Sequence, residues 1–278
     1  MSTYKELLMK ARTILESKQI ADANVDAWYL LTHVFGISRS DFYLYGDQEV
    51  DEEKQRIYLM LTAQRAEHIP LQFITGTQEF MGLEFEVNEN VLIPRQDTQV
   101  LVEEVLRVCE DKSILDMCTG SGCIIISLAK LGKPLKATGV DISEKALETA
   151  TINAKKHKVE IDFIHSNLFD KVKGTYDIIV SNPPYIPSGE INSLMPEVRD
   201  HEPIMALDGD FDGLVFYHRI LEESSRYLKP EGLIFFEIGH NQGEAVTKIL
   251  KQKGFYHIRT IKDLSGLDRV VTGIRSKN

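Results

Sequence analysis

Cysteine is scarce in this sequence, with only Cys109, Cys118 and Cys123 among 278 residues. An odd number of cysteines without a Cys-x-x-Cys pair argues against a disulfide framework and against a structural zinc site. We therefore expect three reduced and mostly buried thiols, as in a cytosolic protein, and no bound metal.

A surplus of basic residues is also absent, since 32 Lys and Arg stand against 42 Asp and Glu, for a net charge of −10. A groove that follows a phosphate backbone usually has the opposite balance, so direct nucleic-acid binding is disfavoured, although this total allows a local basic patch. No apolar run is long enough to span a bilayer, and residues 1–6 are polar, unlike a signal peptide. We expect a cytoplasmic monomer without membrane contact.

Residues 1–72 have the pattern of a small helical domain. Apolar residues recur at helical spacing along residues 4–15 and again along 25–35. Asp22 and Asp51 are placed to cap the second helix and a third one. No catalytic motif occurs in this region.

Residues 73–96 change character and are interpreted as a β-hairpin connector. Leu83, Phe85 and Val87 alternate with glutamates, which is the period of a half-buried strand. We predict that residues 91–93 pair back on this strand across residues 88–90, before Pro94 ends the element.

Residues 97–278 alternate between strand and helix patterns. Strands are expected near residues 113–117, 137–140, 161–164, 176–180, 233–238, 257 and 270. Such alternation predicts an α/β domain with a mainly parallel sheet, here of seven strands. Ligands bind these sheets at the carboxyl ends of the strands, so the loop at 118–122, Asp141 and Asn182 should lie along one edge.

The segment 116–122, Asp-Met-Cys-Thr-Gly-Ser-Gly, follows a predicted strand and opens a helix. Its glycines let the backbone turn tightly against a ligand, and the helix start offers free N–H groups. Asp141 comes 19 residues after Gly122, where a carboxylate can accept both ribose hydroxyl hydrogens of a nucleoside. A dinucleotide site needs a third glycine where this chain has Ile125, so S-adenosyl-L-methionine is favoured over NAD. A purely structural glycine turn is the remaining alternative.

Asn182-Pro183-Pro184-Tyr185 is the most informative stretch of the chain. Two prolines fix the backbone as a rigid extended arm and have no N–H to donate. The Asn182 side-chain oxygen and the Pro183 carbonyl can accept the two hydrogens of an –NH2 group, while Tyr185 can lie flat against a planar amide or ring. A Pro-rich loop that merely ends a strand is the structural alternative.

An amide or aromatic amine nitrogen is a poor nucleophile because its lone pair is delocalised. Accepting both of its hydrogens in a fixed geometry favours a more pyramidal nitrogen, with the lone pair directed at a sulfonium methyl group. Catalysis then comes mainly from in-line orientation and from stabilising the positive charge that develops on nitrogen.

These motifs together resemble the class I amino-methyltransferases, and among them the chain is most similar to the release-factor glutamine methyltransferases (the HemK/PrmC family). The similarity covers nearly the whole chain and includes residues 70–76, 80–82, 91–95, 201–203, 212–214 and 236–239. The Asn-Pro-Pro-Tyr clamp alone does not separate protein methylation from DNA or RNA adenine methylation. The helical region and residues 91–95 do.

The resemblance implies a Rossmann-like class I methyltransferase domain that methylates N5 of the glutamine in the Gly-Gly-Gln motif of bacterial peptide-chain release factors. It implies that residues 1–72 dock the release factor. Asn182, Pro183, Pro184 and Tyr185 would hold the glutamine amide, with Asn182, Pro183 and Tyr185 acting in catalysis. The residues that would hold S-adenosyl-L-methionine are Cys118, Thr119, Gly120, Ser121, Gly122, Asp141 and Asn182, with Asn167 and Leu168 flanking the adenine.

The chain departs from the family pattern at three positions. Cys118 replaces a usual glycine, Asn167 a frequent aspartate, and Asp97 a usual glutamate. An asparagine can still accept from the adenine amino group, so the role expected at Asn167 is compatible with the change.

Other residues and functions remain open from the sequence. Arg95 is expected to pair with a carboxylate or to touch the cofactor, His201 and Glu202 to shape the substrate entrance, and Glu237 to contact substrate or cap the following turn. An adenine-N6 methyltransferase acting on DNA or RNA is the alternative enzyme. A release-factor-binding module without activity is the alternative outside enzymes.

Overall fold

The computed structural model describes residues 2–277. The chain forms two compact units, and each unit consists of two separate stretches of the sequence. The first contains the residues up to Gly76 together with Met195–His201, and the second contains Thr77–Leu194 and the chain from Glu202 onward.

The first unit is helical, as predicted. Its elements are α1 (Tyr4–Ser17), α2 (Ala23–Phe35), α3 (Arg39–Tyr45), α4 (Glu52–Ala66), α5 (Leu71–Thr75) and, from the later segment, α9 (Pro196–Arg199). Asp51 caps α4 by accepting from the Lys54 N–H, as expected, whereas Asp22 precedes α2 without a side-chain cap hydrogen bond. The short helix α3 is an element that the sequence analysis did not predict.

A buried ionic cluster lies inside the first unit. The Arg65 guanidinium donates to Asp26 at 2.6 Å and to Glu197 of α9 at 2.9 Å, and His68 Nδ1 lies 3.0 Å from the same Glu197 carboxylate. The Arg65 and Asp26 side chains are only 8% and 9% exposed, so the buried Asp26 charge depends on Arg65 as its cation. The cluster joins α9 to helices that precede it by about 130 residues in sequence.

The second unit begins with an antiparallel hairpin of β1 (Thr77–Phe80) and β2 (Leu83–Glu86). Met81 and Gly82 form its turn with φ angles of 54° and 71°, as a two-residue primed turn requires. The predicted pairing of residues 91–93 with this strand is wrong. One edge of β2 pairs with β1, side chains of α8 (Glu144–His157) contact the Glu84 and Glu86 backbone, and Val91 and Ile93 instead bury their side chains.

A seven-stranded sheet forms the centre of the second unit, and the predicted α/β architecture is confirmed. The strand order is β5-β4-β3-β6-β7-β9-β8. Strand β9 runs in the direction opposite to that of the other six strands. The strands are β3 (Ser113–Met117), β4 (Lys136–Asp141), β5 (Asp162–His165), β6 (Tyr176–Ser181), β7 (Leu228–Glu237), β8 (Phe255–Lys262) and β9 (Asp268–Arg275).

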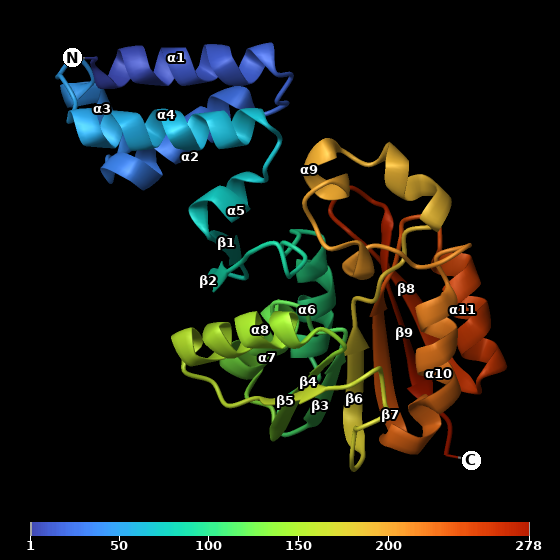
Figure 1. The fold of residues 1–278 in the computed structure, drawn as a ribbon. Helices are drawn as coiled ribbons and strands as arrows, with labels where there is room; N and C mark the ends of the chain where they lie inside the picture. The colour runs from blue at the N-terminus through green and yellow to red at the C-terminus, as the bar shows by residue number, and fades with distance from the viewer. Residues whose placement is uncertain (1, 278) are drawn as a thin grey trace. The chain divides into compact units, whose positions relative to one another are not determined.

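Helices cover both faces of this sheet (Figure 1). They are α6 (Thr98–Leu106), α7 (Cys123–Gly132), α8 (Glu144–His157), α10 (Val215–Tyr227) and α11 (Gly243–Gln252), with short 3₁₀ turns at Ser188–Ser193 and Ile204–Ala206. Because strand side chains alternate, Ile178 and Val180 pack with α6 and α7, while Ile179 packs with α10 and α11.

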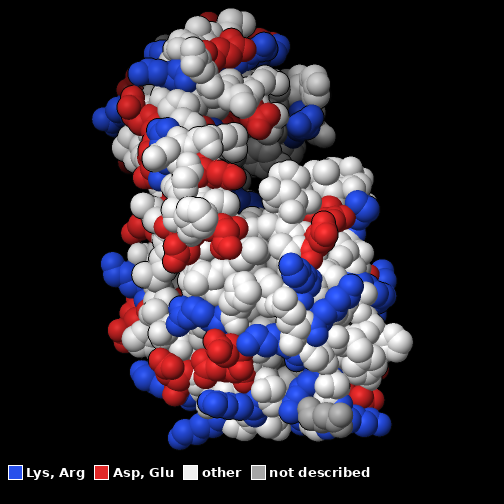
Figure 2. Space-filling model, turned by 90° about the vertical axis from the view of Figure 1, so that its right-hand side faces the viewer, with Lys and Arg blue, Asp and Glu red and all other residues white. Residues whose placement is uncertain are grey.

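The strand order reverses beside β3, since β4 and β6 flank it on opposite sides. The carboxyl ends of β3, β4 and β6 therefore lie next to one another, and this is where a ligand crevice is expected. None of the described helices is long and apolar enough to cross a membrane. On the face shown in Figure 2, basic and acidic side chains are interspersed.

Candidate active site

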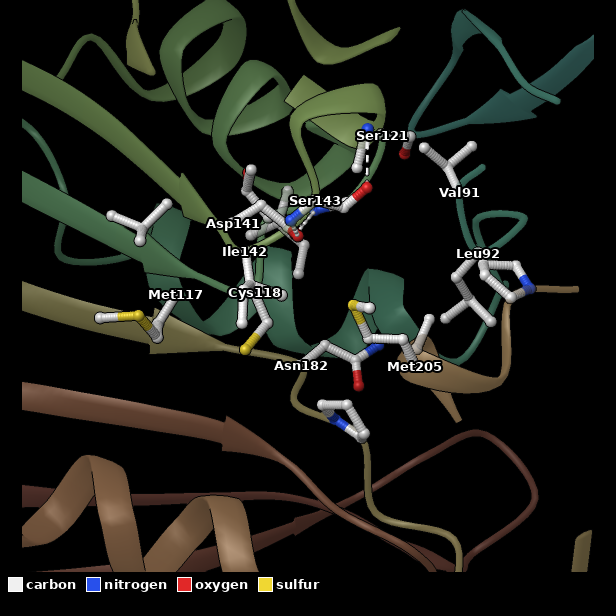
Figure 3. Close-up of a pocket in the computed structure, with 18 of the residues that line it drawn as sticks. Val91, Leu92, Met117, Cys118, Ser121, Asp141, Ile142, Ser143, Asn182 and Met205 are labelled. Carbon is white, nitrogen blue, oxygen red and sulfur yellow. Dashed lines mark hydrogen bonds between the residues drawn. The ribbon is translucent and has the colours of Figure 1, made fainter. Parts of the chain in front are cut away.

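A cavity of about 320 Å³ opens at the carboxyl ends of the three central strands. Ligand pockets in proteins typically range from about 300 to 1,000 Å³. Its walls include Cys118, Thr119, Gly120 and Ser121 after β3, Asp141 at the end of β4, Asn167 and Leu168 after β5, and Asn182 and Pro184 after β6. Figure 3 shows Cys118, Asn182 and Met205 around the same space.

The loop after β3 is held in a conformation that favours glycine. Cys118, Gly120 and Gly122 all have φ between 56° and 79°. A Cβ on Gly122 would meet the Ile126 side chain at 2.8 Å and Ala150 Cβ at 3.2 Å, whereas one on Gly120 would meet nothing within 4 Å. Gly122 therefore lets α7 pack closely, while Gly120 leaves open space.

Cys118 adopts this left-handed conformation without being glycine, at a φ of 64°. Burial raises the pKa of its thiol well above the usual range, so the sulfur is protonated at neutral pH. The residue is therefore a wall of the cavity and not an activated nucleophile.

Asp141 connects the loops after β3 and β4. Its Oδ2 accepts from the Gly120 N–H at 2.8 Å, and its Oδ1 accepts from the Ser143 N–H at 2.9 Å. Desolvation raises the pKa of this carboxyl group despite those hydrogen bonds. Asp141 thus has a structural role as well as any role toward a ligand, so Asp141→Ala would also leave two backbone N–H groups without their acceptor.

Asn167 and Leu168 lie on the cavity wall after β5. The Asn167 Oδ1 accepts from Arg219 Nη2 at 2.9 Å, a partner on α10 that sequence reasoning missed. Arg219 also lies over the Phe216 ring, 5.7 Å from its centroid, and both residues line the cavity. No sequence motif marks them, because their place depends on how α10 packs on the sheet.

The Asn-Pro-Pro-Tyr segment leaves the end of β6, next to the loop after β3. Asn182 and Pro184 line the cavity, while Pro183 and Tyr185 are not part of its wall. Gln242 Nε2 donates to the Tyr185 carbonyl at 2.9 Å, and a Cβ on Gly213 would meet that carbonyl oxygen at 2.2 Å. The backbone of the segment is therefore fixed from the α10 and α11 side.

Arg95 pairs with a carboxylate and also lines the cavity, so a contact with the cofactor stays a prediction. Its Nη2 lies 2.5 Å from Glu202 Oε1, and the Glu202 side chain is 1% exposed. Burial raises the Glu202 pKa, and Arg95 opposes that shift. His201 ends the segment that belongs to the first unit.

Asp116 lies beneath the loop and is fully buried. Its Oδ2 accepts from the Thr119 hydroxyl at 2.6 Å, its Oδ1 has no partner, and desolvation raises its pKa to about 7. Within residues 2–277 no group of three or more His, Cys, Asp or Glu side chains is arranged to hold a metal ion.

Two family models match the chain. The model described as "PrmC N-terminal domain" matches residues 6–76, and the model described as "Methyltransferase small domain" matches residues 95–196. The two matches fall mainly on the helical region and on the first half of the sheet.

Curated relatives that match the chain are named release factor glutamine methyltransferase. The chain is 40% identical over 273 residues to the relative from Geobacter sulfurreducens, covering 98% of this chain and 96% of the relative. It is 40% identical over 279 residues to the relative from Clostridium acetobutylicum, covering 98% of each. It is 34% identical over 291 residues to the one from Haemophilus influenzae, covering 99% of each. These names do not favour adenine methylation.

Solved structures share the fold at low identity. A methyltransferase from Pyrococcus furiosus superposes with a TM-score of 0.55 at 16% identity, covering 81% of this chain and 100% of that one. A 16S rRNA N2 methyltransferase from T. thermophilus, solved with AdoMet and guanosine, gives 0.53 at 17% identity, covering 72% of this chain and 49% of that one. Both support a Rossmann-like methyltransferase fold.

Proposed function

Because the chain belongs to the release factor glutamine methyltransferase family, we propose that it transfers a methyl group from S-adenosyl-L-methionine to the side-chain amide of the glutamine in the Gly-Gly-Gln motif of peptide-chain release factors. One observation connects this proposal with specific side chains of the site. Asn182 lies on the wall of the same cavity as the loop after β3 and Asp141. A methyl donor and an amide acceptor can therefore meet in one space.

The cavity fits S-adenosyl-L-methionine in its donors and acceptors. A carboxylate has about four acceptor positions, and Asp141 uses two of them on backbone N–H groups, which leaves acceptors for ribose hydroxyls. The open space beside Gly120 allows a ligand to approach the backbone. Asn167 and Leu168 are assigned to the adenine, because an amide oxygen that already accepts from Arg219 retains a second lone pair.

S-adenosyl-L-methionine supplies an electrophilic methyl group to this site. The Asn182 Oδ1 and the Pro183 carbonyl accept the two hydrogens of the substrate amide. Pro183 and Pro184 keep the arm rigid, and Tyr185 lies flat against the amide plane. Held in this way, the amide nitrogen would be oriented toward the methyl donor. It would take the methyl group from the sulfonium sulfur, and one amide proton would leave to solvent.

The helical unit is assigned to docking the release factor. Its described surface includes large apolar side chains that are mostly exposed, among them Tyr43 at 85% and Leu44 at 73%. Exposed aromatic and aliphatic side chains of this kind are typical of protein-binding surfaces.

The experiment measures transfer of labelled methyl from S-adenosyl-L-methionine to a purified bacterial release factor. A release factor whose Gly-Gly-Gln glutamine is replaced by alanine serves as the substrate control. We expect label on the parent factor alone, and a loss of about 100-fold or more in kcat for Asn182→Ala. Asn192→Ala, at an exposed position, is the matched enzyme control. Equal labelling of both factors would contradict the assigned glutamine, and no labelling of either would contradict the substrate.

A further inference from the structure

Glu237 is a buried carboxyl group that the proposed reaction has not yet used. It is the last residue of β7, its residue exposure is 1%, and its Oε2 has no hydrogen-bond partner. Burying a carboxyl oxygen that makes no hydrogen bond costs free energy of folding. A group kept in such a place is therefore a candidate for a functional role.

The register of the sheet places Glu237 beside the clamp. Ser181 of β6 pairs with Phe236 of β7, so the next residue of each strand, Asn182 and Glu237, are neighbours at the same sheet edge. The Thr98 and Asn182 side chains lie close enough to the Glu237 carboxyl group to favour its ionised form as hydrogen-bond donors, and so to lower its pKa. Asn182 Nδ2 also lies 3.5 Å from Thr98 Oγ1, and Thr98 is 2% exposed.

This arrangement determines which end of the Asn182 amide faces the cavity. An ionised carboxylate only accepts hydrogen bonds, so it bonds to the Nδ2 of Asn182 and not to the Oδ1. With Nδ2 turned toward Glu237 and Thr98, Oδ1 is left for the cavity. The opposite orientation would put an N–H donor against the –NH2 group of an incoming amide.

We propose that Glu237 is a positioning residue for methyl transfer: with Thr98, it holds Nδ2 of Asn182 so that Oδ1 accepts from the substrate amide. This inference rests on the proposed function, because it assigns Asn182 the role of amide acceptor. It adds a residue that does not itself line the cavity.

The charges around Glu237 set the pH at which this orientation is held. Burial raises its pKa to about 7, against the hydrogen bonds from Thr98 and Asn182 and the Arg269 charge from β9, while Asp97 before α6 favours the neutral form. Other titratable groups that face it are Tyr185, Tyr217 and Cys123.

The sign of the expected pH dependence follows from the ionised form being the active one. Below its pKa the carboxyl group carries a proton and can donate to Asn182 Oδ1, which favours the wrong orientation. Turnover should therefore rise with pH through about 7.

Glu237→Gln tests the proposal, because glutamine keeps the size but brings an –NH2 donor that can bond to Asn182 Oδ1. We expect kcat to fall about 10- to 100-fold with unchanged affinity for S-adenosyl-L-methionine, and the rise near pH 7 to disappear. Glu237→Asp, which keeps the charge, should recover part of kcat. Glu222→Gln, an exposed glutamate on α10, is the matched control.

A second measurement is independent of turnover. In ¹⁵N-labelled protein the Asn182 side-chain amide signal, identified by its loss in Asn182→Ala, should shift with a midpoint near pH 7 in the parent and stay constant in Glu237→Gln. If Glu237→Gln does not fold, Thr98→Val removes the other partner of Nδ2 and should lower kcat in the same way.

The outcomes separate this inference from the proposed function. Parental kcat and pH profile in Glu237→Gln, with Asn182→Ala inactive, would overturn the role of Glu237 alone. A pH-independent Asn182 amide signal would overturn it as well. Failure of the parent protein to methylate a release factor would overturn the proposed function, and the amide signal would still decide whether Glu237 orients Asn182.

Discussion

Replacing Asp141 by asparagine tests the ligand role of this residue with less change to its backbone contacts than alanine would bring. Asparagine keeps the shape of the side chain but has one acceptor oxygen and one –NH2 donor in place of two acceptor oxygens. In the parent protein the aspartate accepts from the Gly120 N–H at 2.8 Å and from the Ser143 N–H at 2.9 Å. One of these two backbone N–H groups would therefore face a donor, and the negative charge offered to the ribose would be lost.

The expected effect on cofactor affinity follows from the number of hydrogen bonds. Each hydrogen bond to a charged group contributes about 1.5–3 kcal/mol, so losing one ribose bond and weakening the other costs about 3 kcal/mol. This corresponds to about a 100-fold increase in Kd for S-adenosyl-L-methionine. Isothermal titration calorimetry on Asp141→Asn measures it directly, with Asp170→Asn, an exposed aspartate, as the control.

The pH dependence of binding gives a second check on the same carboxylate. Desolvation raises the Asp141 pKa in the ligand-free protein, and ribose hydroxyl donors would lower it by favouring the ionised form. Affinity should then increase as the pH rises through the pKa of the free protein and level off above it. A Kd in Asp141→Asn that matches the parent protein at pH 7 would refute this reasoning.

The other predictions concern stability. Gly122→Ala should lower the free energy of unfolding by about 2–3 kcal/mol, because a Cβ there would meet the Ile126 side chain at 2.8 Å at a φ of 79°. Gly120→Ala, with a φ of 56° but open space, should cost only about 1 kcal/mol, and equal losses in urea unfolding would contradict the packing argument. Arg65→Met should destabilise the first unit by about 3–5 kcal/mol, because it leaves the buried Asp26 without its cation. A loss below about 1 kcal/mol in the same assay would show that the ion pair contributes little.

Local patterns predicted the central strands well because β3 and β6 are short and buried over most of their length. The segment 176–181 illustrates this, since its alternate residues face two different helical layers and it therefore reads as a continuous buried strand. Residues 91–93 have the same apolar character, yet they are not a strand. Val91 and Ile93 are buried, and the β2 backbone has β1 and side chains of α8 as its partners.

The candidate site also has one part that the sequence predicted and another that it did not. The loop at 118–122, Asp141 and Asn182 could be placed from sequence, because each directly follows a strand and parallel strands end at one edge. Arg219, which donates to Asn167, and Glu237, which we propose to orient Asn182, could not be paired with their partners. Those contacts depend on the packing of α10 and on the register between β6 and β7, which no local motif encodes. The cofactor and substrate roles themselves stay predictions.

The buried cluster around Arg65 has a consequence for how the chain is made. Arg65 and Glu197 are 132 residues apart in sequence, and α9 belongs to the same compact unit as the first five helices. During synthesis from the N-terminus, those helices can form early, but the Arg65 cluster stays incomplete until residue 197 has left the ribosome. For the same reason, a fragment that ends at Gly76 would lack the carboxylate that Arg65 and His68 share, and a fragment that begins at Thr77 would carry α9 without the helices that bury it. The boundary between the two units is therefore a poor place to cut this protein.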